Sequence, residues 1–166
     1  MNKYLFLILI FYNFSFSQTL WKSNKYSYSV EIPKGFKTAS AIGVSVDFKV
    51  VKDGSSIVIV VRKLPEEARN ATIWEIFGNL DDYAIEWQKG AQENLPNPKV
   101  VKYGKTKIQN FDSFWMDYTT DNGIYYYKNY SLKKGNLFFA ITFSSPISDW
   151  NYYSPFWFRF KEQIKI

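Results

Sequence analysis

Residues 72–93 read TIWEIFGNLDDYAIEWQKGAQE, and strand-like sequence lies on both sides of them. Thr72 and Glu75 have the spacing of a capping box, in which two residues satisfy each other's free backbone N–H groups. Apolar residues then recur at steps of three and four, the period of one helical face. They are Ile73, Ile76, Phe77, Leu80, Ala84, Trp87 and Ala91. The spacing predicts one helix, roughly 72–93, that packs its apolar face on a sheet.

The segments before this helix have the pattern of strands. Residues 26–32 alternate apolar with polar side chains and stop at a Pro-Lys-Gly turn, as a half-buried strand does. Residues 44–51 alternate again, Asp53-Gly54 supplies a hairpin turn, and residues 57–61 form a dense β-branched run. We therefore expect a first strand followed by a hairpin with a central strand.

The segments after the helix predict a meander and a second helix. Strands are expected near 99–103, 105–109, 113–120, 123–132 and 136–144. Towards the end of the chain, Ser154 can cap a helix and Pro155 suits its first position. This order predicts an α+β fold, in which a twisted antiparallel sheet is covered by the long central helix and a C-terminal helix.

Three of these segments resemble PsbP-like domains. Residues 28–36, YSVEIPKGF, resemble the strand that opens those domains, and the helix beginning at Thr72 resembles the helix after their first hairpin. Residues 138–144, FFAITFS, resemble their last strand. The resemblance covers nearly the whole chain after the first 17 residues and implies an α/β/α sandwich. It also implies a family of extracytoplasmic or organellar proteins that mostly act as non-enzymatic assembly or binding factors, and it assigns no functional residue.

Residues 1–17 have the pattern of a secretory signal peptide. A single lysine precedes an apolar run that is too short to span a bilayer, and small residues stand at both required places before the cut. The pattern predicts cleavage between Ser17 and Gln18. We therefore expect residues 18–166 to form one extracytoplasmic domain, either periplasmic or secreted.

Histidine and cysteine are both absent from the 166 residues. The absence of cysteine excludes disulfides, thiolate catalysis, Cys-ligated metals and a lipid-modified Cys anchor. The absence of histidine removes the commonest general base and the commonest transition-metal ligand. We therefore expect a non-catalytic binding or assembly domain with no cofactor, no metal, no catalytic residue and no stable membrane anchor.

The formal net charge of +6 bears on the partner. It is compatible with an anionic protein or small ligand, although a coding bias toward lysine gives the same charge without any function. No nucleic-acid-binding motif occurs in the sequence, and an exported protein rarely meets that partner, so nucleic acid is not expected.

Two groups of side chains are candidates for a ligand or partner surface. Lys99, Lys102, Lys105 and Lys107 form a basic stretch, which suits an anionic partner or, alternatively, protects an edge strand from aggregation. The second group contains Tyr125 and Tyr127 on one face of a predicted strand, and Trp150 before the last helix. These rings are candidate platforms for sugars or apolar ligands, or else they fill the core.

Two other functions remain open. Asp81, Asp82 and Glu86 cluster on the predicted helix, and a carboxylate-dependent glycan hydrolase would need two such acids facing each other across a cleft. A surface-association or carrier module would instead use the lysine stretch and the exposed rings. Neither the ligand nor the oligomeric state follows from the sequence.

Overall fold

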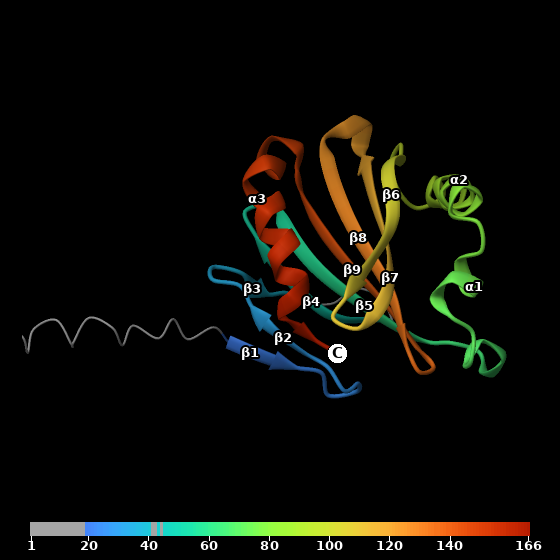
Figure 1. Ribbon diagram of the computed structural model, residues 1–166. Helices are drawn as coiled ribbons and strands as arrows, with labels where there is room; N and C mark the ends of the chain where they lie inside the picture. Colours follow the sequence, from blue (N-terminus) through green and yellow to red (C-terminus); the bar gives the residue numbers. More distant parts are fainter. Residues whose placement is uncertain (1–18, 41–42, 44) are drawn as a thin grey trace, which may run out of the picture.

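A computed structural model describes residues 19–40, 43 and 45–166 (Figure 1). The predicted signal peptide and its cleavage site at Ser17 and Gln18 lie outside these residues. Among the described residues, the main sheet is antiparallel and has the strand order β3-β4-β5-β9-β8-β7-β6. Its strands are β3 (Lys37–Thr38), β4 (Val46–Lys52), β5 (Ser55–Lys63), β6 (Lys99–Ile108), β7 (Phe111–Thr120), β8 (Tyr125–Lys134) and β9 (Leu137–Pro146). The chain therefore forms a meander from β6 to β9, and β9 then pairs with β5.

A small second sheet lies at one end of the molecule. Its strands are β1 (Thr19–Lys22), β2 (Ser29–Ile32) and β10 (Ile164–Lys165), in the order β1-β2-β10. Strand β1 was not expected from the sequence, and the strand predicted from residue 26 begins only at Ser29. The reason is a turn, because Ser23 N–H donates to Tyr28 O at 3.1 Å and Tyr26 N–H donates to Ser23 Oγ at 3.0 Å.

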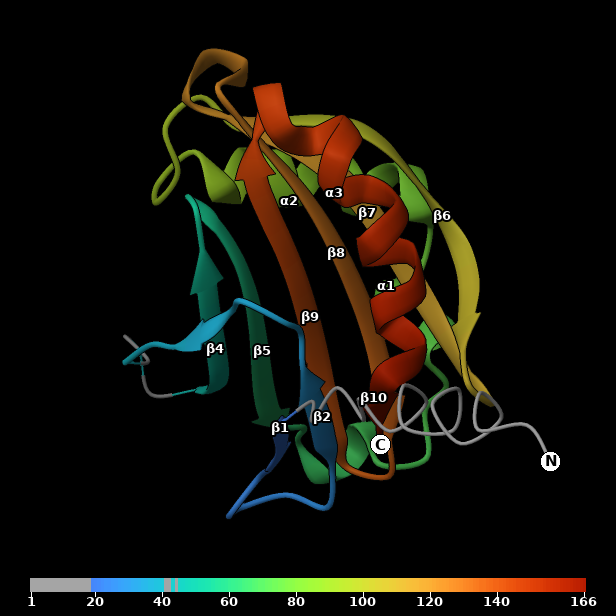
Figure 2. The same ribbon diagram turned by 90° about the vertical axis from the view of Figure 1, so that its left-hand side faces the viewer.

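Helices cover both faces of the main sheet, as Figures 1 and 2 show. Helices α1 (Ile73–Phe77) and α2 (Leu80–Ala91) lie on one face, and α3 (Ile147–Phe160) lies on the other. The fold is thus the α+β sandwich that the order of elements predicts. Within the described part of the chain, no helix is both long and apolar enough to cross a membrane.

The predicted helix over 72–93 is in fact two helices. Its start is confirmed, because Thr72 Oγ1 accepts from Glu75 N–H at 3.2 Å and Glu75 Oε2 accepts from Thr72 N–H at 2.6 Å. However, Gly78 has φ 62° and ψ −133°, which ends α1. Asn79 then caps α2 by accepting the backbone N–H of Asp81 at 2.8 Å. The apolar period continues across this break, and for that reason the stop signal of Gly78 followed by Asn79 was not recognised in the sequence.

The predicted start of the C-terminal helix is also wrong. Helix α3 begins at Ile147, and Pro155 lies inside it instead of at its first position. The earlier start places Trp150 against Tyr126, with ring centroids 4.1 Å apart. Burial of Trp150 therefore favours the two additional turns before Ser154, despite the backbone hydrogen bond that Pro155 cannot donate.

Two predicted strands, 99–103 and 105–109, form the single strand β6. Gly104 lies within it at a close approach to Trp115: a Cβ atom added there would be 3.0 Å from the indole Nε1, tighter than an ordinary contact. The hairpin around Asp53-Gly54 is confirmed, and both turn residues have positive φ, 48° and 77°.

The two layers between sheet and helices contain separate apolar cores. The core under α3 is the larger, and Phe143 stacks there on Trp157 with centroids 5.1 Å apart. The core under α1 and α2 is built around Phe77 and Phe114, whose centroids are 5.0 Å apart. Packing of rings thus holds both faces, as expected for a chain without cysteine.

Candidate functional site

The structure does not bring the predicted lysines together. Lys99, Lys102, Lys105 and Lys107 all lie on β6, an edge strand of the main sheet, but they divide between its two faces. Lys105 lies on the α1 side, where its Nζ is 4.7 Å from the ring centre of Trp74. Lys102 lies on the α3 side, 3.5 Å from a carboxylate oxygen of Asp117. The basic stretch is therefore an edge strand with lysines on both faces, not one surface.

The predicted rings are also divided between the two layers. Tyr127 stacks on Tyr118 in the α2 layer, with an interplanar angle of 2°, and Tyr125 lies 6.5 Å from Tyr127. Trp150 packs on Tyr126 in the α3 layer. These side chains are half-buried packing residues, and they do not form a common platform.

The acidic cluster on α2 lies on an exposed face of that helix. Asp81 accepts a hydrogen bond from the hydroxyl of Tyr103 at 2.8 Å, and its backbone N–H is capped by Asn79. Asp81, Asp82 and Glu86 are all exposed. Among the residues that the structure describes, no group of three acidic side chains is placed to hold a metal ion.

A cleft on the outer side of α3 has the features of a ligand site. It lies between α3 and the loop that follows β2, and its volume is about 390 Å³. Its walls are apolar: Pro33, Phe36, Tyr152, Tyr153, Pro155 and Phe156. The two sides touch through their rings, because Phe36 stacks on Phe156 with centroids 6.1 Å apart and an interplanar angle of 14°. We call this site the α3 cleft.

Helical spacing explains why one strip of α3 lines the α3 cleft. Tyr152, Phe156 and Arg159 are three or four residues apart and therefore lie on the same side of the helix. The buried side of α3 is formed by Tyr153, Trp157 and Phe160, and Tyr153 also reaches the wall of the cleft. Tyr152 is 76% exposed at the rim, which leaves its ring available to a ligand.

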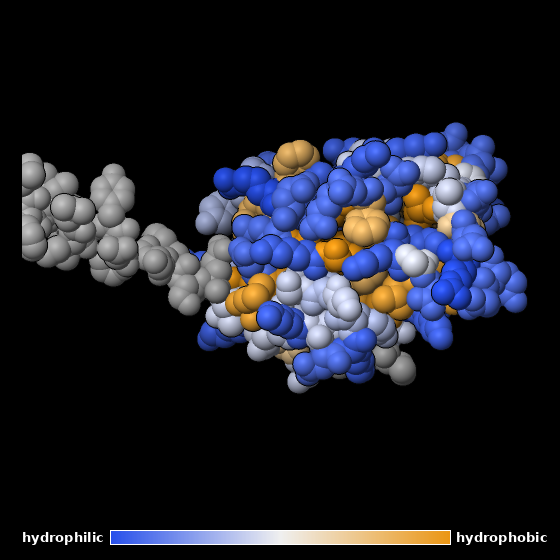
Figure 3. Space-filling model, turned by 60° about the horizontal axis from the view of Figure 1, so that its bottom comes forward, coloured by the Kyte–Doolittle hydropathy of each residue, from blue (hydrophilic) through white to orange (hydrophobic). Residues whose placement is uncertain are grey.

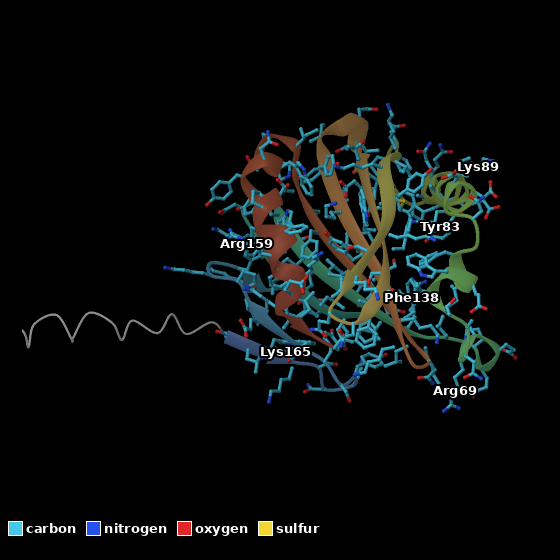
Figure 4. The ribbon with its side chains drawn as sticks, in the orientation of Figure 1. Arg69, Tyr83, Lys89, Phe138, Arg159 and Lys165 are labelled. Carbon is cyan, nitrogen blue, oxygen red and sulfur yellow. The ribbon has the colours of Figure 1, made fainter. Side chains whose placement is uncertain are left out.

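The charged residues of the α3 cleft are all basic. Lys34, Lys52 and Arg159 contribute to its lining, and no acidic side chain does so in the described part of the chain. Neither Lys52 nor Arg159 forms an ion pair with any described residue. Arg159 donates from Nε to the carbonyl of Pro155 at 3.4 Å, and Figure 4 shows it on the side of α3 away from β6. The site therefore combines flat apolar walls with positive charge.

A smaller groove of about 300 Å³ lies between α2 and the main sheet. Four of its lining residues are aromatic: Tyr83, Trp87, Tyr118 and Phe138. Tyr83 and Phe138 come from α2 and β9 (Figure 4), and burial raises the pKa of Tyr83. Arg62 is the single charged residue among the described residues that line it. This groove offers much less charge than the α3 cleft.

Sequence reasoning missed the α3 cleft because its halves are distant in the chain. Residues 33–36 and 152–159 meet only in the folded protein, and the sequence assigns the first segment to a turn and to the PsbP-like opening segment, not to a ligand site. A usable signal was present in the Pro-Lys-Gly-Phe turn, since this loop carries both a cation and a ring. Nothing in the sequence pattern, however, indicates which helix the loop contacts.

Comparisons with known proteins identify the fold. No protein-family model matches the sequence, and no curated protein matches it. Among solved structures, cyanobacterial PsbP (CyanoP) from Synechocystis sp. PCC 6803 matches with a TM-score of 0.72 over 89% of this chain and 91% of that chain. The fold is PsbP-like. The sequence identity in this PsbP-like alignment is only 11%, so the likeness concerns the fold alone.

Two further structures share the PsbP-like fold. LpqN of Mycobacterium tuberculosis, described as involved in cell envelope biogenesis, matches with a TM-score of 0.57 and 9% identity, over 89% of this chain and 88% of that chain. PA94 of Pseudomonas aeruginosa, described as a protein of unknown function and putative regulator, matches with a TM-score of 0.52 and 18% identity, over 87% of this chain and 93% of that chain. The PsbP-like resemblance of the sequence segments is thus confirmed at the level of fold.

Proposed function

We propose that this protein is an extracytoplasmic, non-catalytic binding domain whose α3 cleft holds a small organic anion with a flat apolar part. The observation that carries the proposal is the make-up of the cleft, in which rings and prolines form the walls and every charged residue is a cation. An apolar group would pack against the exposed ring of Tyr152 and the outer edge of the Phe36–Phe156 stack while its negative charge meets Lys52 and Arg159. Arginine suits this role because its planar group binds a carboxylate, sulfonate or phosphate in a bidentate manner.

The size of the α3 cleft supports a small ligand. Its volume of about 390 Å³ lies in the range of small-molecule sites, which are typically mostly apolar with a few placed polar groups. A charge-assisted hydrogen bond contributes about 1.5–3 kcal/mol, and partial exposure of the cations places their contribution near the lower limit. Loss of one cation should therefore weaken binding roughly tenfold.

The location and the absence of catalysis are supported by the sequence. The first 17 residues have the signal-peptide pattern, and the chain offers no histidine or cysteine for acid–base or nucleophilic chemistry. LpqN, one of the proteins with the same fold, is described as taking part in cell envelope biogenesis, which is in keeping with an extracytoplasmic role.

The test uses a matched pair of fluorescent probes. Anilinonaphthalene sulfonate carries a sulfonate on flat rings, whereas N-phenylnaphthylamine has similar rings and no charge. We expect the purified protein to bind the sulfonate more tightly than the neutral probe. Arg159→Gln and Lys52→Gln should each reduce affinity for the sulfonate roughly tenfold and leave the neutral probe almost unaffected.

Arg62→Gln is the matched control, because it removes the same charge from the groove beside α2. It should leave sulfonate binding unchanged. Equal affinity for the two probes, or an equal loss in the Arg62→Gln and Arg159→Gln variants, would refute the proposal.

A further inference from the structure

A second basic surface lies at the end of the sandwich, where the small sheet meets the turn between β8 and β9. An open hollow of about 610 Å³ is found there. Four lysines line it: Lys22, Lys25, Lys134 and Lys165. They come from β1, the β1–β2 loop, β8 and β10, so only the folded protein brings them together. We call this surface the basic end.

The positive charge of the basic end is not neutralised by neighbouring side chains. None of its four lysines forms an ion pair with a described residue, and no acidic side chain belongs to the lining in that part of the chain. The carboxylate of Asp47 contacts this lining, because it accepts hydrogen bonds from Ser23 Oγ at 2.6 Å and Tyr28 Oη at 2.8 Å. Asp47 is therefore already engaged by hydroxyl groups of the same loop.

Apolar surface adjoins the basic end. A slot of about 260 Å³ shares Ser27 and Lys134 with the hollow and continues along Gly135, Leu137 and Phe139. On the neighbouring β1, Leu20 is 48% exposed. Figure 3 brings this end of the molecule forward and shows a mostly hydrophilic surface with separate hydrophobic patches between the polar side chains. Lysines beside modest apolar patches are typical of surfaces that contact lipid headgroups.

We infer that the basic end docks the protein onto the surface of an anionic lipid bilayer. Charge complementarity favours this occupant. The four lysines come from separate segments and are spread around an open hollow, so they suit a broad anionic surface better than a single anionic group in a closed pocket. Long lysine side chains can reach headgroup phosphates while their alkyl stems cover the apolar patches. The anionic surface attracts each such lysine with an energy that corresponds to about a fivefold gain in affinity. Four lysines together give a gain of roughly a hundredfold or more.

The test measures sedimentation of the purified protein with lipid vesicles. Vesicles of phosphatidylcholine with one quarter phosphatidylglycerol are compared with vesicles of phosphatidylcholine alone. We expect binding to the anionic vesicles only, and a loss of binding between about 50 mM and 500 mM salt, since the Debye length falls several-fold over that range. Replacing Lys22, Lys25, Lys134 and Lys165 by Gln should reduce affinity roughly a hundredfold or more.

The matched control removes the same charge elsewhere. Its four Gln substitutions are at Lys37, Lys89, Lys99 and Lys107, which are all exposed. The affinity of this variant for anionic vesicles should fall less than tenfold. Replacing the four lysines of the basic end by Arg should preserve binding, which separates loss of charge from loss of folding. The sulfonate probe of the α3 cleft should bind all variants equally, so that the two proposals are tested independently.

Three results would overturn the inference. One is an equal loss of vesicle binding in the two Gln variants, which would make net charge the sole cause. Another is equal binding to neutral and anionic vesicles. The third is binding to a soluble acidic polysaccharide such as heparin without binding to anionic vesicles.

Discussion

Asp117 is the side chain whose replacement tests the packing of the α3 layer most directly. Its carboxylate is 1% exposed. One oxygen accepts from the hydroxyl of Tyr126 at 3.0 Å, and the other accepts from Lys128 Nζ. Lys102 Nζ lies 3.5 Å from the same carboxylate. Burial lowers the pKa of Lys128, Asp117 opposes this effect, and Lys102 and Lys161 add to the lowering.

The perturbation is Asp117→Asn, which keeps the shape and removes the charge. The amide presents either an NH₂ group or a neutral oxygen to Lys128, whose ammonium group remains largely buried. Loss of one partner from a buried ion pair costs about 3–5 kcal/mol. We expect the free energy of unfolding to fall by about 3 kcal/mol, the lower limit of this range, because 17% of the Lys128 side chain is exposed and can recruit water.

Urea unfolding followed by tryptophan fluorescence measures this difference. With a slope of about 2 kcal/mol per molar urea, the midpoint should fall by roughly 1.5 M. Lys102→Gln is the control: its side chain is 60% exposed, so its pair with Asp117 should contribute less than about 1 kcal/mol. Asp117→Asn combined with Lys128→Met should recover part of the loss. Equal, small losses for Asp117→Asn and Lys102→Gln would refute the reasoning.

Three further predictions concern stability. Burial raises the pKa of Tyr118 and of Tyr126 above 10.0, so the stability they contribute is complete below that pH and is lost as the pH rises above it. Tyrosinate absorbance should therefore increase together with unfolding in alkali, and ionisation of these tyrosines without unfolding would contradict the prediction. Gly104→Ala should cost about 1 kcal/mol in urea unfolding, since the indole of Trp115 must give slightly to accept a Cβ atom 3.0 Å away, and an unchanged midpoint would contradict the close approach. Thr72→Ala should cost about 1 kcal/mol and Thr72→Ser much less, and equal costs would argue against the cap.

Local signals predicted the elements of this fold well. The capping box at Thr72 and the hairpin turn at Asp53-Gly54 depend on neighbouring residues, and both are confirmed. The break at Gly78 was missed because the helical period continues through it, although Gly followed by Asn is itself a stop and start signal. Pro155 was misplaced because a proline inside a helix is costly, and packing of α3 in the folded protein, including Trp150 on Tyr126, offsets that cost.

The candidate sites were much less accessible to sequence reasoning than the fold. The lysines of β6 were recognised as one stretch because they are close in sequence. Alternation along the strand and a bulge between Val100 and Lys102 place Lys102 and Lys105 on opposite faces. The cations of the α3 cleft and of the basic end are far apart in the chain and meet through long-range pairing. Charge clusters formed in this way leave no local pattern.

The pairing of β5 with β9 has a consequence for the order in which the molecule can assemble. Ser56 lies opposite Ser144, so the central strand acquires this neighbour only when the last 30 or so residues are present. Strands β6 to β9 follow one another directly and can pair locally, whereas β5 must wait with one open edge. The sheet therefore cannot close until β9 has formed. Until then β5 presents a β-branched edge on which non-native strand pairing can begin.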